Sequence, residues 1–126
     1  LIDLNGDSHP DLVSGSVDVP VEIWWGTGAG DFDSPTVLDE IATQLVGGDL
    51  DKDGDTDLVL GKGDNQGNRI AWNIGNGDFL LDPQILGATY TRSLALGDLN
   101  GDGWLDLIEG NLHQENRLWI CTPLVE

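Results

Sequence analysis

An acidic nine-residue pattern recurs three times along the chain, at residues 3–11, 49–57 and 98–106, and a short apolar run follows each copy. Positions 1, 5 and 9 are aspartate in every copy, and position 3 is aspartate or asparagine. Side-chain oxygens at these positions, with a backbone carbonyl at position 7, can supply the six to eight oxygen ligands that calcium takes. Asp-Gly and Asn-Gly pairs also favour ordinary turns. Turn formation alone does not require aspartate at positions 1, 5 and 9, so the pattern predicts calcium-binding loops.

The third copy also satisfies the pattern of a helix–loop–helix calcium hand, because Glu109 occupies its position 12. That motif needs a helix on each side of the loop. Residues 90–97 instead alternate polar and apolar residues in their second half, which predicts a strand. Position 12 is Ser14 in the first copy and Leu60 in the second, and neither can chelate bidentately. Ligation is therefore expected to close at position 9 of each loop.

The similarity between the copies extends beyond the loops. The loops begin at residues 3, 49 and 98, so the period is 46 to 49 residues, in the range of propeller blades. Each unit has the pattern of a strand before the loop, a strand after it, a third strand, a Gly-rich turn and a weak fourth strand. The expected strands are 43–47 and 92–96 before the loops, 11–15, 57–61 and 106–110 after them, 21–25, 69–74 and 117–121 in third place, and 36–38 and 84–86 in fourth place.

Four short antiparallel strands per unit make one propeller blade. We therefore predict an all-β fold of β-propeller-type blades, with about two and a half to three blades in one repeat domain, 1–126. The approximate units are 1–42, 43–91 and 92–126; the first lacks its leading strand and the last is incomplete. Closed propellers need four to eight blades. We expect either a partial propeller within a longer chain or a ring closed by homo-oligomerisation, most simply a dimer with six blades.

A Gly-x-Gly-Asp-Phe turn follows the third strand in two of the units, at residues 28–32 and 75–79. Together with the acidic loops, this makes the chain resemble the FG-GAP and VCBS repeats, the calcium-loop blades of integrin alpha-subunit propellers and of many secreted bacterial proteins. The resemblance implies up to three calcium ions and an extracellular or cell-surface location. His9, Asp55 and Trp104 would contribute only their carbonyls. The implied side-chain ligands are Asp3, Asn5, Asp7 and Asp11, then Asp49, Asp51, Asp53 and Asp57, then Asp98, Asn100, Asp102 and Asp106.

The three loops differ in charge and in backbone freedom. The second has four carboxylate ligands, whereas asparagine replaces one carboxylate in the first and third. The first loop has Ser8 where the others have Gly54 and Gly103, so its turn is expected to be strained. Calcium affinity follows ligand charge and site rigidity. We predict that the second loop binds most tightly and the first most weakly.

The composition excludes several classes of partner. The formal charge is −18 and the pI is about 4.1, so the surface repels nucleic acid and anionic membranes. No apolar stretch reaches 18 residues, which predicts no membrane insertion. The single cysteine, Cys121, excludes an internal disulfide. Leu1 is not a start methionine and no basic-then-apolar leader precedes the first loop, so we expect any secretion signal to lie outside this sequence.

Five tryptophans fall on or near the predicted strands and loops. Alternation in the third strands predicts that Trp25 and Trp72 pack between blades. Trp24, Trp104 and Trp119 remain open between core positions and platforms on which a sugar ring stacks. The resemblance keeps saccharide binding possible, because some fungal lectins use propellers with such loops.

A catalytic reading has little support in the sequence. His9 and His113 have no matching Ser or Cys nucleophile motif nearby. Asp31 and Asp33 are spaced closely enough for glycoside hydrolysis, but Asp31 recurs as Asp78 in the equivalent turn, which favours a structural role. We expect a non-catalytic module for extracellular adhesion or recognition, with a protein or glycan ligand. The alternatives are a lectin-type propeller and an accessory part of a secreted carbohydrate-active enzyme.

Overall fold

The computed structural model describes residues 1–122, which contain ten β-strands and no helix. Within this range there is accordingly no helix that could cross a membrane. The strands are β1 (Leu12–Ser14), β2 (Glu22–Trp24), β3 (Thr36–Val37), β4 (Gln44–Gly48), β5 (Asp57–Gly61), β6 (Arg69–Asn73), β7 (Phe79–Leu81), β8 (Thr91–Gly97), β9 (Asp106–Asn111) and β10 (Arg117–Trp119).

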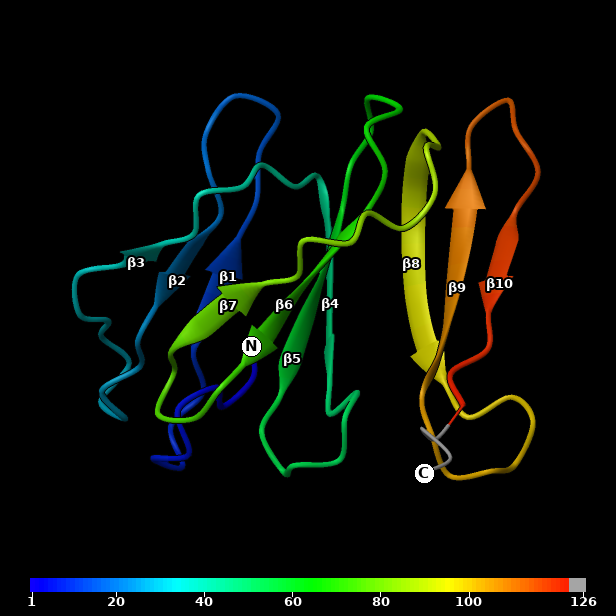
Figure 1. Cartoon of the computed structure of the whole chain (residues 1–126). Coiled ribbons are helices and arrows are strands. Elements are labelled where there is room, and N and C mark those ends of the chain that lie inside the picture. Colours follow the sequence, from blue (N-terminus) through cyan, green and yellow to red (C-terminus); the bar gives the residue numbers. More distant parts are fainter. Residues whose placement is uncertain (123–126) are drawn as a thin grey trace.

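The strands form three antiparallel sheets that stand side by side in chain order (Figure 1). Sheet 1 has the order β1-β2-β3, sheet 2 the order β4-β5-β6-β7, and sheet 3 the order β8-β9-β10. Sheet 2 is a complete four-stranded blade. Sheet 1 lacks the strand that would lead into its loop, and sheet 3 has no fourth strand among the described residues. The predicted all-β, blade-type fold is confirmed, and the ring is open.

Each pair of neighbouring sheets encloses one hydrophobic core, because both faces of sheet 2 are covered. The first core lies between sheets 1 and 2 and the second between sheets 2 and 3. Alternation along β6 explains the division, since Ala71 belongs to the first core while Ile70 and Trp72 pack in the second. The most buried members are Leu4, Val21, Ile23, Leu58, Leu60 and Ala71 in the first core, and Leu50, Val59 and Leu107 in the second.

The positions predicted for Trp25 and Trp72 are confirmed. Trp25 packs in the first core, and its indole N–H donates to the Thr36 hydroxyl at 2.9 Å. Trp72 packs in the second core and donates to Asp82 at 2.8 Å. Trp119 also packs against the second core, so one of the three undecided tryptophans is a core residue.

The expected fourth strand at residues 84–86 is wrong. The turn at residues 75–77 is left-handed at all three residues and so reverses the chain tightly, and the Ile74 N–H donates to the Asp78 carbonyl at 2.9 Å. Pairing with β6 therefore begins at once, at Phe79, and gives β7. Pro83, which lacks an N–H donor, follows β7. Residues 84–86 contribute only an isolated bridge from Leu86 to Asn68.

The missing leading strand of sheet 1 leaves an apolar groove between β1 and β4. Its volume is about 300 Å³. The isolated bridge from Ile2 to Asp11 is the single pairing on this edge of sheet 1 among the described residues. The groove is lined by Leu1, Ile2, Val13, Leu45, Val46, Gly47 and Leu58.

Candidate metal centre

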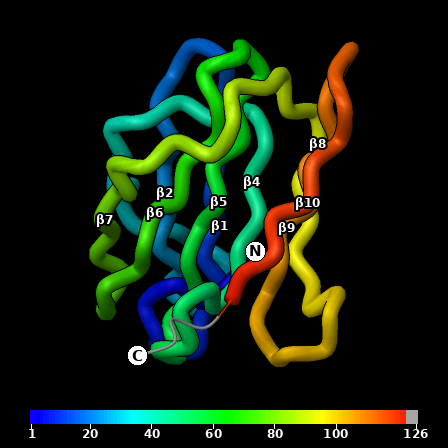
Figure 2. Tube along the Cα trace, turned by 45° about the vertical axis from the view of Figure 1, so that its right-hand side comes forward, coloured from blue at the N-terminus to red at the C-terminus, as the bar shows by residue number. Residues whose placement is uncertain are grey.

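The three acidic loops lie at the same end of the sheets, as both views show (Figures 1 and 2). The second loop connects β4 to β5 and the third connects β8 to β9, while the first precedes β1. A backbone pair closes each loop at its base. These pairs are Ile2 with Asp11, Gly48 with Asp57, and Gly97 with Asp106. Three equivalent turns are thereby placed side by side along one rim.

Position 5 of each loop shapes the turn. Its carboxylate accepts a hydrogen bond from the N–H of position 7 at 2.8 Å in the first loop, 2.9 Å in the second and 2.8 Å in the third. Aspartate commonly bonds the backbone two residues on in this way. The carboxylates concerned are those of Asp7, Asp53 and Asp102. One oxygen of each is therefore engaged in forming the turn.

Positions 4 and 6 of each loop have left-handed backbone conformations. Most of these residues are glycines, but Ser8 has φ +70° and Lys52 has φ +65°. The expected strain at Ser8 is thus present in the backbone. A comparable departure at Lys52, in the second loop, was not predicted from the sequence. The two non-glycine residues place similar strain in the first and second loops.

The aspartate at position 9 fastens each loop to its sheet. All three residues are fully buried, and each accepts two backbone hydrogen bonds. In the second loop, Asp57 accepts from the Leu50 N–H at 2.8 Å and from the Asn73 N–H at 2.9 Å. Asp11 and Asp106 make the equivalent pairs of bonds. A buried carboxylate that satisfies two strand and loop N–H groups stabilises the blade itself.

The aspartate at position 1 is hydrogen-bonded differently in the second loop than in the other two. In the first and third loops, both oxygens of this carboxylate accept backbone N–H groups of the loop. Asp49 instead makes one longer bond, from the Gly54 N–H at 3.2 Å, and its other oxygen, Oδ1, is buried with no hydrogen-bond partner. An ionised oxygen in that state is costly unless a cation or donor satisfies it.

Asp49, Asp51 and Asp57 form an acidic cluster in the second loop. One carboxylate oxygen from each lies within 4.8 Å of the others. Together with the unpartnered Oδ1 of Asp49, this donor set fits a hard divalent cation such as calcium. The structure thus brings together three of the four side-chain ligands predicted for this loop, and Asp53 is directed to its own turn.

The pKa shifts of the aspartates also distinguish the second loop from the first and third. Partial desolvation of this exposed side chain, together with the neighbouring charges of Asp53 and Asp49, raises the pKa of Asp51. Burial also raises the pKa of Asp57. The pKa values of Asp7 and Asp102 are lowered, in each case mainly by the N–H bond from position 7. A cation would relieve repulsion most in the second loop.

Asparagine at position 3 explains part of this contrast. The Asn5 amide donates to Asp7 at 3.1 Å, and the Asn100 amide donates to Asp102 at 2.9 Å. Asp51 has no such donor to offer Asp53. The predicted ligands of the first and third loops are therefore held in internal hydrogen bonds, and the structure does not gather them into a carboxylate cluster like that of the second loop within residues 1–122.

Asn73 is a site residue that the sequence did not reveal. Its buried amide donates to the carbonyl of Leu4 in the first loop at 2.7 Å and to the carbonyl of Thr56 in the second at 3.1 Å. It therefore ties two neighbouring loops together. The equivalent positions in the other units are Gly26 and Cys121, which also donate their N–H to the position-9 aspartate, so no repeated residue type marked this one.

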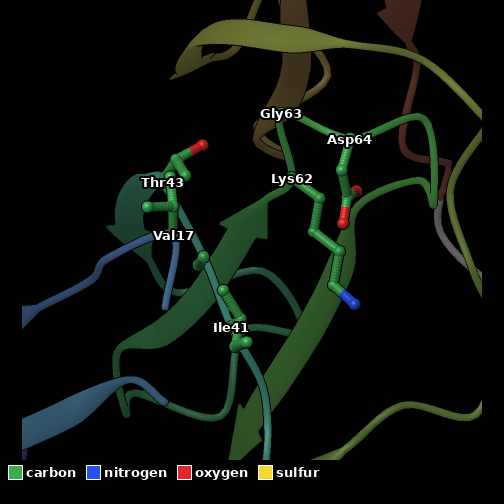
Figure 3. Close-up of a pocket in the computed structure, with 7 residues that line it drawn as sticks. Val17, Ile41, Thr43, Lys62, Gly63 and Asp64 are labelled. Carbon is green, nitrogen blue, oxygen red and sulfur yellow. The ribbon is translucent and has the colours of Figure 1, made fainter. Parts of the chain in front are cut away.

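A small pocket lies near the opposite ends of the strands, where sheets 1 and 2 meet (Figure 3). Its volume is about 70 Å³, far below that of a small-molecule site. Lys62 on its wall forms an ion pair with Glu40, which also pairs with Arg69 at 3.1 Å. The pocket lies between two sheets, has a mainly apolar lining and offers no room for a sugar ring.

Comparison with known proteins agrees with the geometry of the repeats. The family model of the FG-GAP-like repeat matches residues 49–108, which span the second loop, β5 to β8, the third loop and the start of β9. Searches of the curated proteins and of the solved structures found no match. The matched segment contains two of the three acidic loops and three of the four strands of sheet 2, β5 to β7. On this match, supported by the repeated blades, residues 49–108 form an FG-GAP-like repeat region.

Proposed function

We propose that this protein is a calcium-binding repeat module, without catalysis of its own, that acts in adhesion or recognition outside the cell. The observation that carries the calcium proposal is the acidic cluster of Asp49, Asp51 and Asp57, with the buried Oδ1 of Asp49 unpartnered. Oxygen-only donors and a net charge of −18 favour a hard divalent cation over softer metals.

Calorimetric titration of chelator-treated protein with calcium chloride tests the site. We expect saturable binding with the tightest step in the second loop. Asp49→Asn should remove that step, because it withdraws the carboxylate with the free oxygen. Asp39→Asn, which changes an exposed aspartate outside the loops, is the matched control and should leave the titration unchanged. A titration without heat, or one unaffected by Asp49→Asn, would contradict the assignment.

The proposed partner follows from the sheet faces that are exposed to solvent. Among residues 1–122, nothing covers the faces of sheets 1 and 3 that point away from sheet 2. Leu118 in β10 and Ile120, just after it, are exposed by 53% and 45%. Exposed apolar side chains on a sheet face are suited to protein contact. A protein ligand or a further copy of this chain is therefore the partner class we favour.

Saccharide binding is a second candidate, and Trp24 is the tryptophan that remains available as a stacking platform. Trp119 packs in the second core, and Trp104 lies beneath a lysine of the second loop. Trp24 is half-buried on the uncovered face of sheet 1, and its indole N–H donates to Glu22 at 3.3 Å. A glycan array with wild type and Trp24→Phe separates the two: hits that depend on Trp24 would favour the lectin.

A further inference from the structure

Lys52 of the second loop reaches across the boundary between sheets 2 and 3. Its ammonium lies over the ring of Trp104 in the third loop, 4.6 Å from the ring centroid. A Cβ on Gly103 would lie 3.2 Å from the same ammonium, so the chain of Lys52 rests against the third loop. The two loops carry different predicted cation sites, and this contact connects them.

Lys52 occupies a backbone position that favours glycine. Lys52 stands at position 4, where the other two loops have Gly6 and Gly101, and it adopts the same left-handed conformation at φ +65°. A lysine is disfavoured there relative to glycine. Within residues 1–122 its ammonium forms no ion pair, although its own loop contains five aspartates. The side chain leaves these carboxylates and lies on the indole.

From this geometry we propose that Lys52 is a positioning residue that couples the second and third loops, so that a cation in the second loop orders the third. The inference rests on the proposed function. A cation can order the second loop, including Lys52 at its centre. The ordered Lys52 then holds Trp104, whose carbonyl is the predicted position-7 ligand of the third loop. The second site thereby prepares the third.

Two effects of Lys52 on the third loop oppose each other. Its positive charge contributes to the lowered pKa of Asp102 and repels a cation bound there. Because Lys52 is exposed, solvent and salt screen this repulsion. The contact with the indole is short-ranged and less affected by salt. At physiological salt the ordering effect should dominate, with a coupling of about two- to fivefold in affinity, the value of one exposed cation–π contact.

The indole N–H resonance of Trp104 reports the coupling directly. The protein has five tryptophans, and the resonance is assigned with Trp104→Phe. Asp98→Asn weakens the third site and leaves Lys52 and Trp104 in place. In this variant, calcium chloride should still shift the Trp104 resonance through the second loop. Adding Lys52→Gln should abolish that shift, and Lys52→Arg should retain it, since arginine also stacks on indole.

The remaining outcomes distinguish a failure of the coupling from a failure of the proposed calcium-binding function. The Trp25 resonance serves as the control and should not respond to changes at Lys52, because Trp25 packs in the other core. In the protein with an intact third loop, Lys52→Gln should lower the affinity of that loop about two- to fivefold. If calcium shifts other loop resonances but Trp104 is silent in Asp98→Asn, the coupling is refuted and the calcium site stands. If no resonance responds to calcium, the proposed function itself fails.

Discussion

The aspartates of the acidic loops have two different roles, and their burial separates them. Asp57 is fully buried and accepts two backbone hydrogen bonds, whereas Asp53 is exposed and bonds only the turn. A residue of the first kind stabilises the blade whether or not a cation is present. A residue of the second kind matters mainly when a cation binds, because the turn bond that it makes is exposed.

Alanine substitutions should therefore separate the two roles. Asp57→Ala should lower the free energy of unfolding by about 3 kcal/mol or more, with or without calcium, because it leaves two buried N–H groups unpaired. Asp53→Ala should cost less than about 1 kcal/mol in chelator and more in calcium. Urea unfolding in both conditions measures this. Equal calcium dependence of the two variants would contradict the separation.

Asp51 provides a test of the electrostatics. Asp51→Asn should raise the melting temperature of calcium-free protein at pH 7 by about 2–4 °C, since it removes a charge that Asp49 and Asp53 repel. It should weaken calcium binding, because it removes a carboxylate ligand. Opposite effects in chelator and in calcium are the expected signature. A variant that is less stable in both conditions would show that the repulsion is unimportant.

The same residue fixes the sign of a pH effect. The folded, calcium-free protein has a raised pKa at Asp51 and so binds this proton more tightly than the unfolded chain. Stability contributed by this group therefore rises as the pH falls through the raised pKa, which lies above 3.8, and is lost above it. The advantage of Asp51→Asn over wild type should shrink between pH 7 and pH 4.

At the scale of single elements, the hairpin turns show why the glycines of the repeat differ in importance. Gly77 has φ +78°, and a Cβ there would lie 2.4 Å from the Trp25 ring of the neighbouring sheet. Gly30, at the equivalent position in sheet 1, has φ +88°, and a Cβ there would meet no atom within 4 Å. Gly77 is needed both for the turn and for the packing of the Trp25 ring, whereas Gly30 is needed only for the turn.

The pair of alanine variants tests this difference. Gly30→Ala should cost about 1 kcal/mol, the strain of a left-handed alanine alone. Gly77→Ala should cost about 2–4 kcal/mol, because Trp25 must also move out of the first core. Thermal unfolding followed by near-ultraviolet circular dichroism reads both stability and the packing of Trp25. Equal losses for the two variants would contradict the contact.

The observed strands show which elements could be predicted from the sequence and which could not. The three strands of sheet 3 and the first three of sheet 2 follow directly from the period and from alternation, because each repeats in more than one unit. The position of β7 did not follow, since its onset depends on how tightly residues 75–77 turn. The sequence predicts Asp57 only as a calcium ligand, and not as the residue that fastens the second loop to its sheet. Asn73 and Lys52 could not be assigned because no other unit has their residue type.

At the scale of the whole molecule, the two ends of the sheet array are incomplete in different ways. Sheet 1 has an open groove beside β1, whereas sheet 3 exposes the side chains of Ile108 and Leu118. Their register equivalents in sheet 2, Val59 and Ile70, pack in the second core. The uncovered face of sheet 3 therefore has the pattern of a surface that another sheet covers.

Self-association through this face is the expected behaviour of the purified chain. Light scattering should give a mass above the 13.5 kDa of one chain, and twice that value if two copies close a ring of six blades. Leu118→Asp should shift the mass toward the monomer. Ile74→Asp, an exposed residue in the turn after β6, is the matched control and should not. A monomeric wild type at all concentrations would contradict closure by a second copy.

Calcium dependence of thermal stability tests the central claim most directly. At calcium concentrations about tenfold above a dissociation constant of about 10⁻⁴ M, each occupied loop adds about 1.4 kcal/mol and three loops add about 4 kcal/mol. This is a large part of a typical free energy of unfolding of about 5–15 kcal/mol. The melting temperature should therefore fall by several degrees on chelation and recover when calcium is restored. An identical melting curve after exhaustive chelation and in calcium would contradict the account.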